Sequence, residues 1–374
     1  MKILIGTTRP FHLFHLANAL ASQGHEITVV GYMPRSRCEL KIDHVVYISL
    51  FWKYFPITVL AFQRYNRFLQ GWATLNLMKK VDKFLVKHLR NKTNQYDLFI
   101  GLSGCAVESF DAAMSKSIKT ICERGSSHVS YQQKVMLDSS SEFLDVGYVD
   151  RELKGYSKAN YISTLSAFAK NTFLEHGVPA DKILLNPLGV NLERFPSRSF
   201  RPIDNQDFSI IFVGGWGYRK GCDILSEYVN RTEGSSLLHV GTVGVSSFPG
   251  GDRIKKMGHV ANGDLSALYQ KADILILPSR EDGFGMVLLE ALVSGCYVIA
   301  SKNTGGPEIK EMAQHYSGIQ IMDDVSVESI ARCVDAFGKV TQSEYTDFVA
   351  NVRPSLGWSG YGKRYWESFE KLVK

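Results

Sequence analysis

Short apolar runs of strand length alternate with helical patterns along most of this chain, and this alternation restricts its fold more than any other feature. The runs are continuously apolar, as in KILIGTT (2–8), YDLFIGLS (96–103), FSIIFVGG (208–215) and ADILILPS (272–279). Continuous runs are typical of parallel strands that helices cover on both faces, whereas strands with one solvent-exposed face alternate apolar and polar residues. The sequence therefore predicts an α/β protein with doubly wound parallel sheets.

The alternation pauses at NLERFPSRSFRPIDNQD (191–207), which is rich in proline, serine and charge. Such a composition is typical of a linker, and 374 residues are more than one ordinary core holds. We expect two Rossmann-like domains, residues 1–190 and 191–356, that face a central cleft. The terminal segment 357–374 is aromatic and amphipathic, and we expect a helix that packs back on the first domain.

The overall composition is that of a soluble globular protein, with 45% hydrophobic and 21% charged residues. No apolar run approaches the ~18 residues of a membrane span, and the opening MKILIGTTRP lacks a signal-peptide pattern. The six cysteines show no paired spacing, and no Cys/His cluster has zinc spacing. We therefore expect a cytoplasmic protein with reduced thiols and no bound metal.

Positive charge is concentrated in one stretch, residues 53–92, where nine Lys or Arg accompany a single acid, Asp82. Aromatic residues accompany these charges: Phe51, Trp52, Tyr54, Phe55, Phe62, Tyr65, Phe68 and Trp72. One interpretation is a helical region with a solvated basic face and an aromatic core face. The other is a patch that rests on anionic lipid headgroups at the inner face of a membrane. Nucleic acid is not expected, because the basic excess is local and no nucleic-acid-binding motif accompanies it.

A glycine-spaced turn and an apolar helix follow one another in SREDGFGMVLLEALVSG (279–295). The turn passes through Gly283, Phe284 and Gly285, and the helix begins at Met286. The first amides of a helix have no intrahelical acceptor, and glycines let a ligand approach the backbone closely. This stretch therefore predicts an anion site.

Glu290 is the one charged residue inside that apolar helix. A buried carboxylate needs partners, because an unpaired one costs several kcal/mol. The partners are either a structural ion pair or a ligand rich in hydroxyls, such as a ribose. Asp282, eight residues earlier on the turn, is placed to accept from a second hydroxyl-bearing group.

A pair of cations, Arg219 and Lys220, stands at a predicted helix start in FVGGWGYRKGCDIL (212–225). Cations there oppose the helix dipole unless an anion is present. They are either a solvated charge pair or the groups that neutralise a diphosphate in the cleft. Gly305 and Gly306 in NTGGPEI offer another backbone cradle. The N-terminal GTTRPFH lacks G-x-G-x-x-G, which disfavours a nicotinamide enzyme.

These motifs together resemble glycosyltransferase family 4, whose members have the two-domain GT-B fold and retain the configuration of the sugar. The resemblance is carried by LILPSREDGFGMVLLEALVSGCYVIASKNTGGPEI, IFVGGWGYRKGCDIL, NPLGVNLERF, GHVANGDLSALYQKADILIL and the opening MKILIG…LANALASQGHEITVV. It spans nearly the whole chain and is most specific from Ala272 to Ile309.

The resemblance implies roles for the donor-side residues. Glu290 would bind the donor ribose, and Asp282, where the family usually has glutamate, would bind the transferred sugar. Lys220 would bind the diphosphate, and Arg219 would replace the arginine that the family usually has at the position of Gly215. The implied donor site also contains Gly214, Gly215, Val260 near the base, Gly283, Phe284, Gly285, Met286, Gly305 and Gly306.

The acceptor side depends on the N-terminal domain. Many family members carry a His-Asp or His-Glu pair after an N-domain strand, and this chain has CERGSSH there. Its Glu123, Arg124 and His128 are therefore candidates, His128 also for catalysis, although a structural role for this loop histidine is equally compatible with the sequence. The remaining acceptor-side candidates are Gly6, Thr7, His12 and His15, the two histidines as packing or rim residues.

The implied reaction is transfer of a hexosyl unit from a nucleotide-diphosphate sugar to a saccharide or lipid-linked acceptor, in the synthesis of cell-surface polysaccharide or lipopolysaccharide. No D-x-D sequence is present to hold a metal, so Lys220, Arg219 and the helix amides are expected to stabilise the departing diphosphate. Two alternatives remain: a non-catalytic sugar-nucleotide-binding subunit that regulates a partner transferase, and a nucleotide-sugar epimerase of the same fold.

Overall fold

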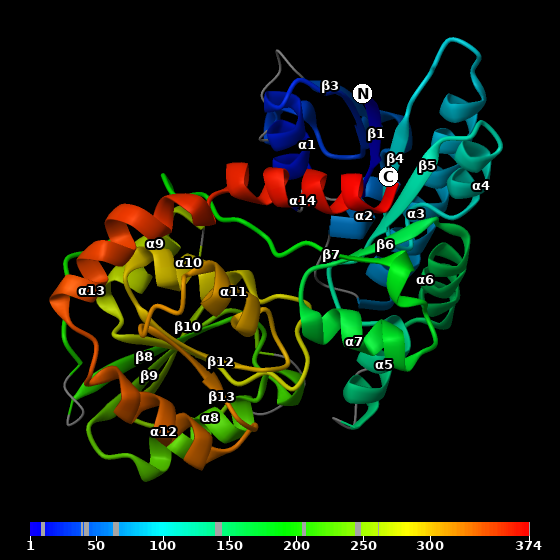
Figure 1. The fold of residues 1–374 in the computed structure, drawn as a ribbon. Coiled ribbons are helices and arrows are strands. Elements are labelled where there is room, and N and C mark those ends of the chain that lie inside the picture. Colours follow the sequence, from blue (N-terminus) through cyan, green and yellow to red (C-terminus); the bar gives the residue numbers. More distant parts are fainter. Residues whose placement is uncertain are drawn as a thin grey trace.

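The computed structural model describes residues 1–8, 12–38, 40, 45–62, 67–138, 144–203, 207–243, 248–260 and 262–373. Figure 1 shows two α/β lobes, each built around a sheet with helices on its faces. The first sheet consists of β1 (Lys2–Gly6), β2 (Glu26–Gly31), β3 (Val45–Ser49), β4 (Leu98–Leu102), β5 (Lys119–Glu123), β6 (Tyr161–Thr164) and β7 (Ile183–Leu185). Its helices are α1 (His12–Ser22), α2 (Ile57–Phe62), α3 (Arg67–Arg90), α4 (Glu108–Met114), α5 (Val129–Asp138), α6 (Val146–Lys158) and α7 (Ala167–Glu175).

The second sheet begins after the predicted linker. It consists of β8 (Phe208–Val213), β9 (Ser235–Val240), β10 (Ile254–Gly258), β11 (Ile274–Leu277), β12 (Tyr297–Ser301) and β13 (Ile319–Met322). The helices that follow are α8 (Cys222–Arg231), α9 (Asn262–Lys271), α10 (Met286–Ser294), α11 (Gly306–Met312), α12 (Val327–Phe337), α13 (Gln342–Asp347) and α14 (Trp358–Val373).

Both sheets follow the same winding. The strand orders are β3-β2-β1-β4-β5-β6-β7 and β10-β9-β8-β11-β12-β13, and all these strands pair in parallel. Each chain path starts at a central strand, moves to one edge and then returns to the other side, as in Rossmann-like folds. The predicted fold class, two doubly wound α/β domains, is confirmed.

The central strands are buried along their whole length, as their continuous apolar sequences predict. Every residue of β4, β11 and β12 is buried. The sequence pattern did not single out β3 or β10, which are edge strands. An edge strand is covered on fewer sides, and β10 accordingly exposes Lys255, Lys256 and Met257.

The C-terminal helix α14 returns to the first lobe, where it lies beside α1 (Figure 1). The ring of Trp358 stacks on His15 with centroids 4.2 Å apart, and Trp366 contacts His25 at 4.1 Å. Tyr361 and Tyr365 of α14 are fully buried. The two lobes are thus tied by the chain after β7 and by α14. Among the described helices, none is both long and apolar enough to cross a bilayer.

Candidate active site

A pocket of about 580 Å³ lies between the two domains, at the carboxyl ends of their strands. The N-terminal wall comes from residues that follow β1, β4, β5 and β6, among them Thr8, Ser103, Arg124 and Leu165. The opposite wall comes from Gly214 after β8 and from the start of α10. In doubly wound sheets the carboxyl ends of the strands are where ligands bind.

Lys220 and Asp282 form an ion pair on the C-terminal wall of this pocket, between Lys220 Nζ and Asp282 Oδ2. Lys220 ends the helical turn before α8, and Asp282 lies on the turn before α10. Their side chains are only 15% and 19% exposed. An anionic ligand in the pocket would therefore compete with Asp282 for the ammonium group, while the freed carboxylate could accept hydroxyl groups.

The start of α10 forms the adjoining part of the same wall. Gly285 precedes the helix with a φ of 78°, and a β-carbon there would lie 2.8 Å from Leu277 Cδ2. Met286 and Val287, in the first turn of the helix, then line the pocket. Lys220 and the amides of this turn provide positive potential at one place, which suits a phosphate or diphosphate.

Glu281 connects the two domains, and the sequence pattern does not single it out. Its side chain is fully buried, and its Oε1 accepts from the hydroxyls of Ser126 and Ser127, both at 2.8 Å. Its Oε2 accepts from Arg219 Nη1 at 2.6 Å. Burial raises the pKa of Glu281, but Arg219, Ser127 and Lys220 offset this and lower it overall. Glu281 therefore joins the two domains as a carboxylate.

Arg219 has a protein partner in this arrangement, so its predicted contact with a diphosphate stays a prediction. Its Nη1 donates to the carboxylate of Glu281 and, at 3.1 Å, to the carbonyl of the same residue, and Arg219 does not line the pocket. The sequence offers one indication of this ion pair: Arg219 and Glu281 carry opposite charges and belong to two motifs that the fold brings together. The spacing of Asp282 and Glu290, eight residues apart, gives no indication of it.

The domains also touch directly around the turn before α10. Ser166 Oγ donates to the carbonyl of Gly283 at 2.8 Å, and the amide of Ala167 donates to Glu308 Oε1 at 2.6 Å. A β-carbon on Gly283 would lie 2.3 Å from the carbonyl oxygen of Gly125. Glycine is therefore required at Gly283 by the closeness of the other domain, which encloses the pocket on this side.

Glu290 is not without a protein partner. Its Oε2 accepts a hydrogen bond from the buried hydroxyl of Tyr269 at 3.1 Å. Burial raises the pKa of Glu290, and Tyr269 and Arg194 only partly oppose this effect. Glu290 does not line the pocket described above, so its predicted contact with a ribose stays a prediction.

The N-terminal wall contains a hydrogen-bonded pair, His12 and Glu123. His12 lines the pocket, and its Nε2 lies 2.9 Å from Glu123 Oε1. Tyr365 of α14 donates to the other carboxylate oxygen at 3.1 Å. The C-terminal helix thus fixes the carboxylate that orients the histidine.

Arg124, also on this wall, forms a buried ion pair with Glu152 at 3.0 Å. Burial alone would lower the pKa of Arg124, but Glu152 and neighbouring tyrosines raise it overall. The guanidinium also donates to Tyr148 Oη at 3.1 Å and Gln132 Oε1 at 2.8 Å. Arg124 is therefore a charged but internally neutralised part of the acceptor-side wall.

His128 is placed away from the pocket, which argues against the predicted catalytic role. Its ring is buried and stacks on His176 with centroids 4.1 Å apart. The amide of Ser130 donates to its Nδ1 at 3.3 Å. Burial, His176 and Arg124 lower the pKa of His128 to about 3. A neutral packing histidine is the role that this environment supports.

The structure thus divides the predicted site residues into two groups. Those that line the pocket are His12, Arg124, Gly214, Lys220, Asp282, Phe284, Gly285 and Met286. Those that do not are Gly6, Thr7, His15, Glu123, His128, Gly215, Arg219, Val260, Gly283, Glu290, Gly305 and Gly306. Gly6, for example, faces the core, where a β-carbon would lie 2.7 Å from Leu85, and the neighbouring Thr8 faces the pocket instead.

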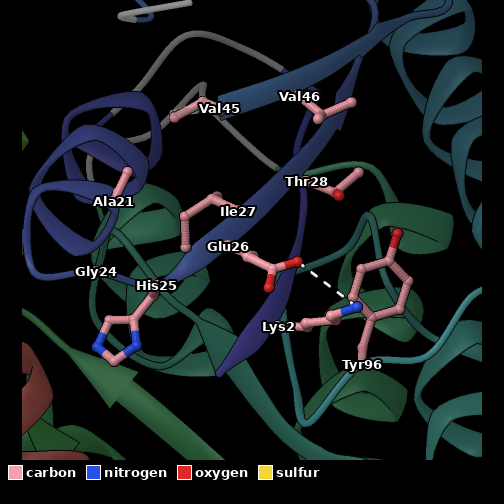
Figure 2. Close-up of a pocket in the computed structure, with 10 residues that line it drawn as sticks. All are labelled: Lys2, Ala21, Gly24, His25, Glu26, Ile27, Thr28, Val45, Val46 and Tyr96. Carbon is pink, nitrogen blue, oxygen red and sulfur yellow. Dashed lines mark ion pairs between the residues drawn. The ribbon is translucent and has the colours of Figure 1, made fainter. Parts of the chain in front are cut away.

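A second hollow, of about 420 Å³, lies at the opposite end of the first sheet (Figure 2). Lys2 and Glu26, the first residues of β1 and β2, form an ion pair there at 3.6 Å. Much of the remaining lining is apolar, including Ala21, Ile27 and Val45. Because it lies at the amino ends of the strands, it is not the place where this architecture binds its ligand.

Parts of this chain are similar to a known protein family and to known proteins. Residues 207–337 match the family model "Glycosyl transferases group 1". An uncharacterized 41.2 kDa protein in the cps region of Klebsiella pneumoniae is 28% identical over 137 residues, 34% of this chain and 38% of that protein. The GDP-mannose-dependent alpha-(1-6)-phosphatidylinositol monomannoside mannosyltransferase of Mycobacterium tuberculosis is 26% identical over 202 residues, 49% of this chain and 50% of that protein. The matches therefore span half or less of these two relatives.

The fold as a whole has counterparts among solved structures. Sucrose-phosphate synthase from Thermosynechococcus elongatus superimposes with a TM-score of 0.67 at 17% identity, over 100% of this chain and 99% of that one. Such a likeness concerns the fold, and the family match lies in the second domain, which carries Lys220 and Asp282. Residues 207–337 are therefore similar to the glycosyl transferases group 1, and the chain as a whole has the two-domain GT-B fold.

Proposed function

We propose that this protein is a retaining glycosyltransferase that moves a hexosyl unit from a nucleotide-diphosphate sugar to a saccharide or lipid-linked acceptor. The observation that carries the proposal is the pairing of Lys220 with Asp282 beside the first turn of α10, inside the interdomain pocket. The cation and the helix amides match the diphosphate of such a donor, and the carboxylate matches its sugar hydroxyls.

In this proposal the transition state is stabilised at the leaving group. The sugar becomes oxocarbenium-like while negative charge grows on the departing diphosphate. Lys220 and the amides of α10 stabilise this charge. Asp282 holds hydroxyls of the transferred sugar, and Glu290 binds the ribose. The departing phosphate takes the acceptor proton on the face from which it leaves, so that configuration is retained. No metal is required for this charge stabilisation.

The acceptor would enter along the N-terminal wall. His12, oriented by Glu123 at 2.9 Å, and Ser103 are among the polar residues that line this wall. The relative named for GDP-mannose and a phosphatidylinositol monomannoside supports a nucleotide-sugar donor and is consistent with a lipid-borne acceptor. We place the reaction in the assembly of cell-surface polysaccharide or lipopolysaccharide, on the cytoplasmic side.

A thermal-shift panel of nucleoside diphosphates and nucleotide sugars tests the donor assignment. A ligand at a hundred times its dissociation constant should stabilise the folded protein by about 2.7 kcal/mol. Lys220→Ala should lose most of that stabilisation, and Lys271→Ala, an exposed lysine of the same domain, should keep it. Stabilisation by no member of the panel would contradict the donor site. Donor binding without transfer to any acceptor would favour a non-catalytic binding subunit, and interconversion of free donors would favour an epimerase.

A further inference from the structure

The outer face of α3 and the segment before α2 carry exposed aromatic rings together with positive charge. We call this the α2–α3 surface and define it by Trp52, Lys53, Phe55, Trp72, Lys79, Lys83, Lys87 and Arg90. Trp52 is 77% exposed and Trp72 is 49% exposed, and Phe55 is exposed as well. Apolar rings gathered on a surface in this way mark a site of contact with something less polar than water.

The helix α3 is strictly two-sided, which places its cations on this surface. Its buried side chains recur every four residues: Ala73, Leu77, Val81, Leu85 and Leu89. Its exposed ones, Trp72, Lys79, Lys83, Lys87 and Arg90, are spaced by helical turns on the other side. One tryptophan and four cations therefore form a single stripe.

The aromatic turn before α2 is held against the middle of that helix. The hydroxyl of Tyr54 donates to the carbonyl of Lys80 at 3.2 Å, and Lys53 Nζ lies 4.8 Å from the ring centroid of Phe84. The rings of Trp52 and Phe55 lie 5.7 Å apart. The rings and the cations thus form one continuous surface.

Acidic side chains near this surface already have cationic partners. Asp82 is buried and accepts from Arg151 at 2.8 Å. On the adjoining α4, Asp111 pairs with Lys158 at 2.5 Å and Glu108 lies 3.7 Å from Arg151. The α2–α3 surface therefore presents net positive charge.

We propose that the α2–α3 surface docks on an anionic lipid bilayer, with its aromatic rings among the headgroups and its lysines on the lipid phosphates. Rings of tryptophan favour the headgroup region, and basic residues gain from the negative surface potential. The opposite flank of α3 lines the interdomain pocket through Thr74 and Met78. Docking therefore brings the pocket close to the lipid headgroups, where a lipid-borne acceptor would be found.

Some of the predicted basic and aromatic stretch lies outside the described residues, namely Arg64 and Tyr65, as do the side chains of Phe62, Arg67 and Phe68. The proposal rests on the described side chains alone.

Vesicle flotation of the purified protein tests the docking. Binding should be strong to vesicles of phosphatidylcholine with phosphatidylglycerol, weak to phosphatidylcholine alone, and reduced by salt. Each lysine removed should weaken binding about fivefold, the equivalent of about 1 kcal/mol. The triple variant Lys79→Ala/Lys83→Ala/Lys87→Ala should therefore bind about a hundredfold more weakly. The control Lys255→Ala/Lys256→Ala/Lys271→Ala removes the same charge from exposed positions of the second domain and should bind normally.

The aromatic part is tested by Trp52→Ser/Trp72→Ser, which should weaken binding to anionic vesicles and leave the melting temperature unchanged, because both rings are exposed. Equal binding to neutral and anionic vesicles, or equal loss in the two lysine triples, would overturn the proposal. Self-association that the tryptophan variant abolishes, without vesicle binding, would show that a second copy of the chain covers this surface instead. Flotation needs no sugar transfer, so its outcome is separate from that of the proposed function.

Discussion

Glu281 of the second domain accepts a hydrogen bond from Ser127 of the first, with 2.8 Å between Oε1 and Oγ. The same carboxylate is the partner of Arg219, the residue next to Lys220. One buried group therefore connects the N-terminal wall of the pocket to the segment that positions the proposed diphosphate contact.

Glu281→Ala should destabilise the protein and loosen the contact between its domains. The change leaves two serine hydroxyls without their acceptor and removes the carboxylate partner of Arg219, which keeps only the backbone carbonyl of residue 281; this should cost about 2–3 kcal/mol. Thermal unfolding measures the loss, and small-angle scattering of the unliganded protein should show a larger radius of gyration. Ser127→Ala, which keeps the pair of Glu281 with Arg219, should show a smaller effect. An unchanged melting temperature in Glu281→Ala would contradict the role of this residue.

The same carboxylate should contribute to acid sensitivity. Its pKa in the folded protein is lowered below the usual 4.5. The unfolded state therefore binds the proton more readily, so this contribution to stability is complete above pH 4.5 and is lost as the pH falls through the folded pKa. Comparison of wild type with Glu281→Gln across acidic pH should show a steeper loss in the wild type, and parallel curves would contradict this.

Glu290→Gln should separate a structural role from a role in donor binding. If Glu290 binds the ribose before and during reaction, the donor KM should rise more than kcat falls. Burial raises the pKa of Glu290, so the folded state is penalised once the carboxyl ionises, and the penalty grows as the pH rises through the folded pKa. The variant, whose amide can still accept from Tyr269, should therefore gain stability relative to wild type with rising pH. A much lower melting temperature with unchanged donor KM would show that Glu290 is structural.

His128→Asn should change pH-dependent stability rather than catalysis. In the folded protein the pKa of His128 is about 3, against 6.5 when unfolded. The unfolded state thus takes up a proton as the pH falls below 6.5, and the wild type loses stability from there towards pH 3. The variant should lack this part of the slope, and at neutral pH its kcat should fall far less than that of Lys220→Ala. A fall as large as that of Lys220→Ala, in a folded variant, would restore His128 as a catalytic candidate.

Treatment with EDTA should leave sugar transfer largely intact. The reason is that, in the proposed mechanism, Lys220 and the amides of α10 stabilise the charge that grows on the diphosphate. Initial rates before and after chelation check this. Complete loss of activity, restored by magnesium or manganese, would show that the leaving group needs a metal.

The fold could be predicted from sequence because its central strands are buried on both faces. Strands buried in this way have continuously apolar sequences, as β11 and β12 do. It could be predicted that Lys220 and Asp282 face one cleft, because the glycine turns and helix starts that position them are local signals. Glu281 was missed because its partners Ser126 and Ser127 belong to the other domain, and their contact depends on how the domains meet. The sequence left both a catalytic and a structural role open for His128 for the same reason, since its neighbours His176, Tyr156 and Phe173 come from segments distant in sequence.

The central claim is that Lys220 stabilises the diphosphate of a nucleotide-sugar donor in the interdomain pocket. The most direct test is the steady-state release of nucleoside diphosphate from the donor that stabilises the protein best, measured for wild type, Lys220→Ala and the control Lys271→Ala. The account predicts that kcat falls by roughly 10²–10³, or about 3–4 kcal/mol, in Lys220→Ala alone, because the lost interaction grows towards the transition state. Equal turnover by wild type and a correctly folded Lys220→Ala would contradict it.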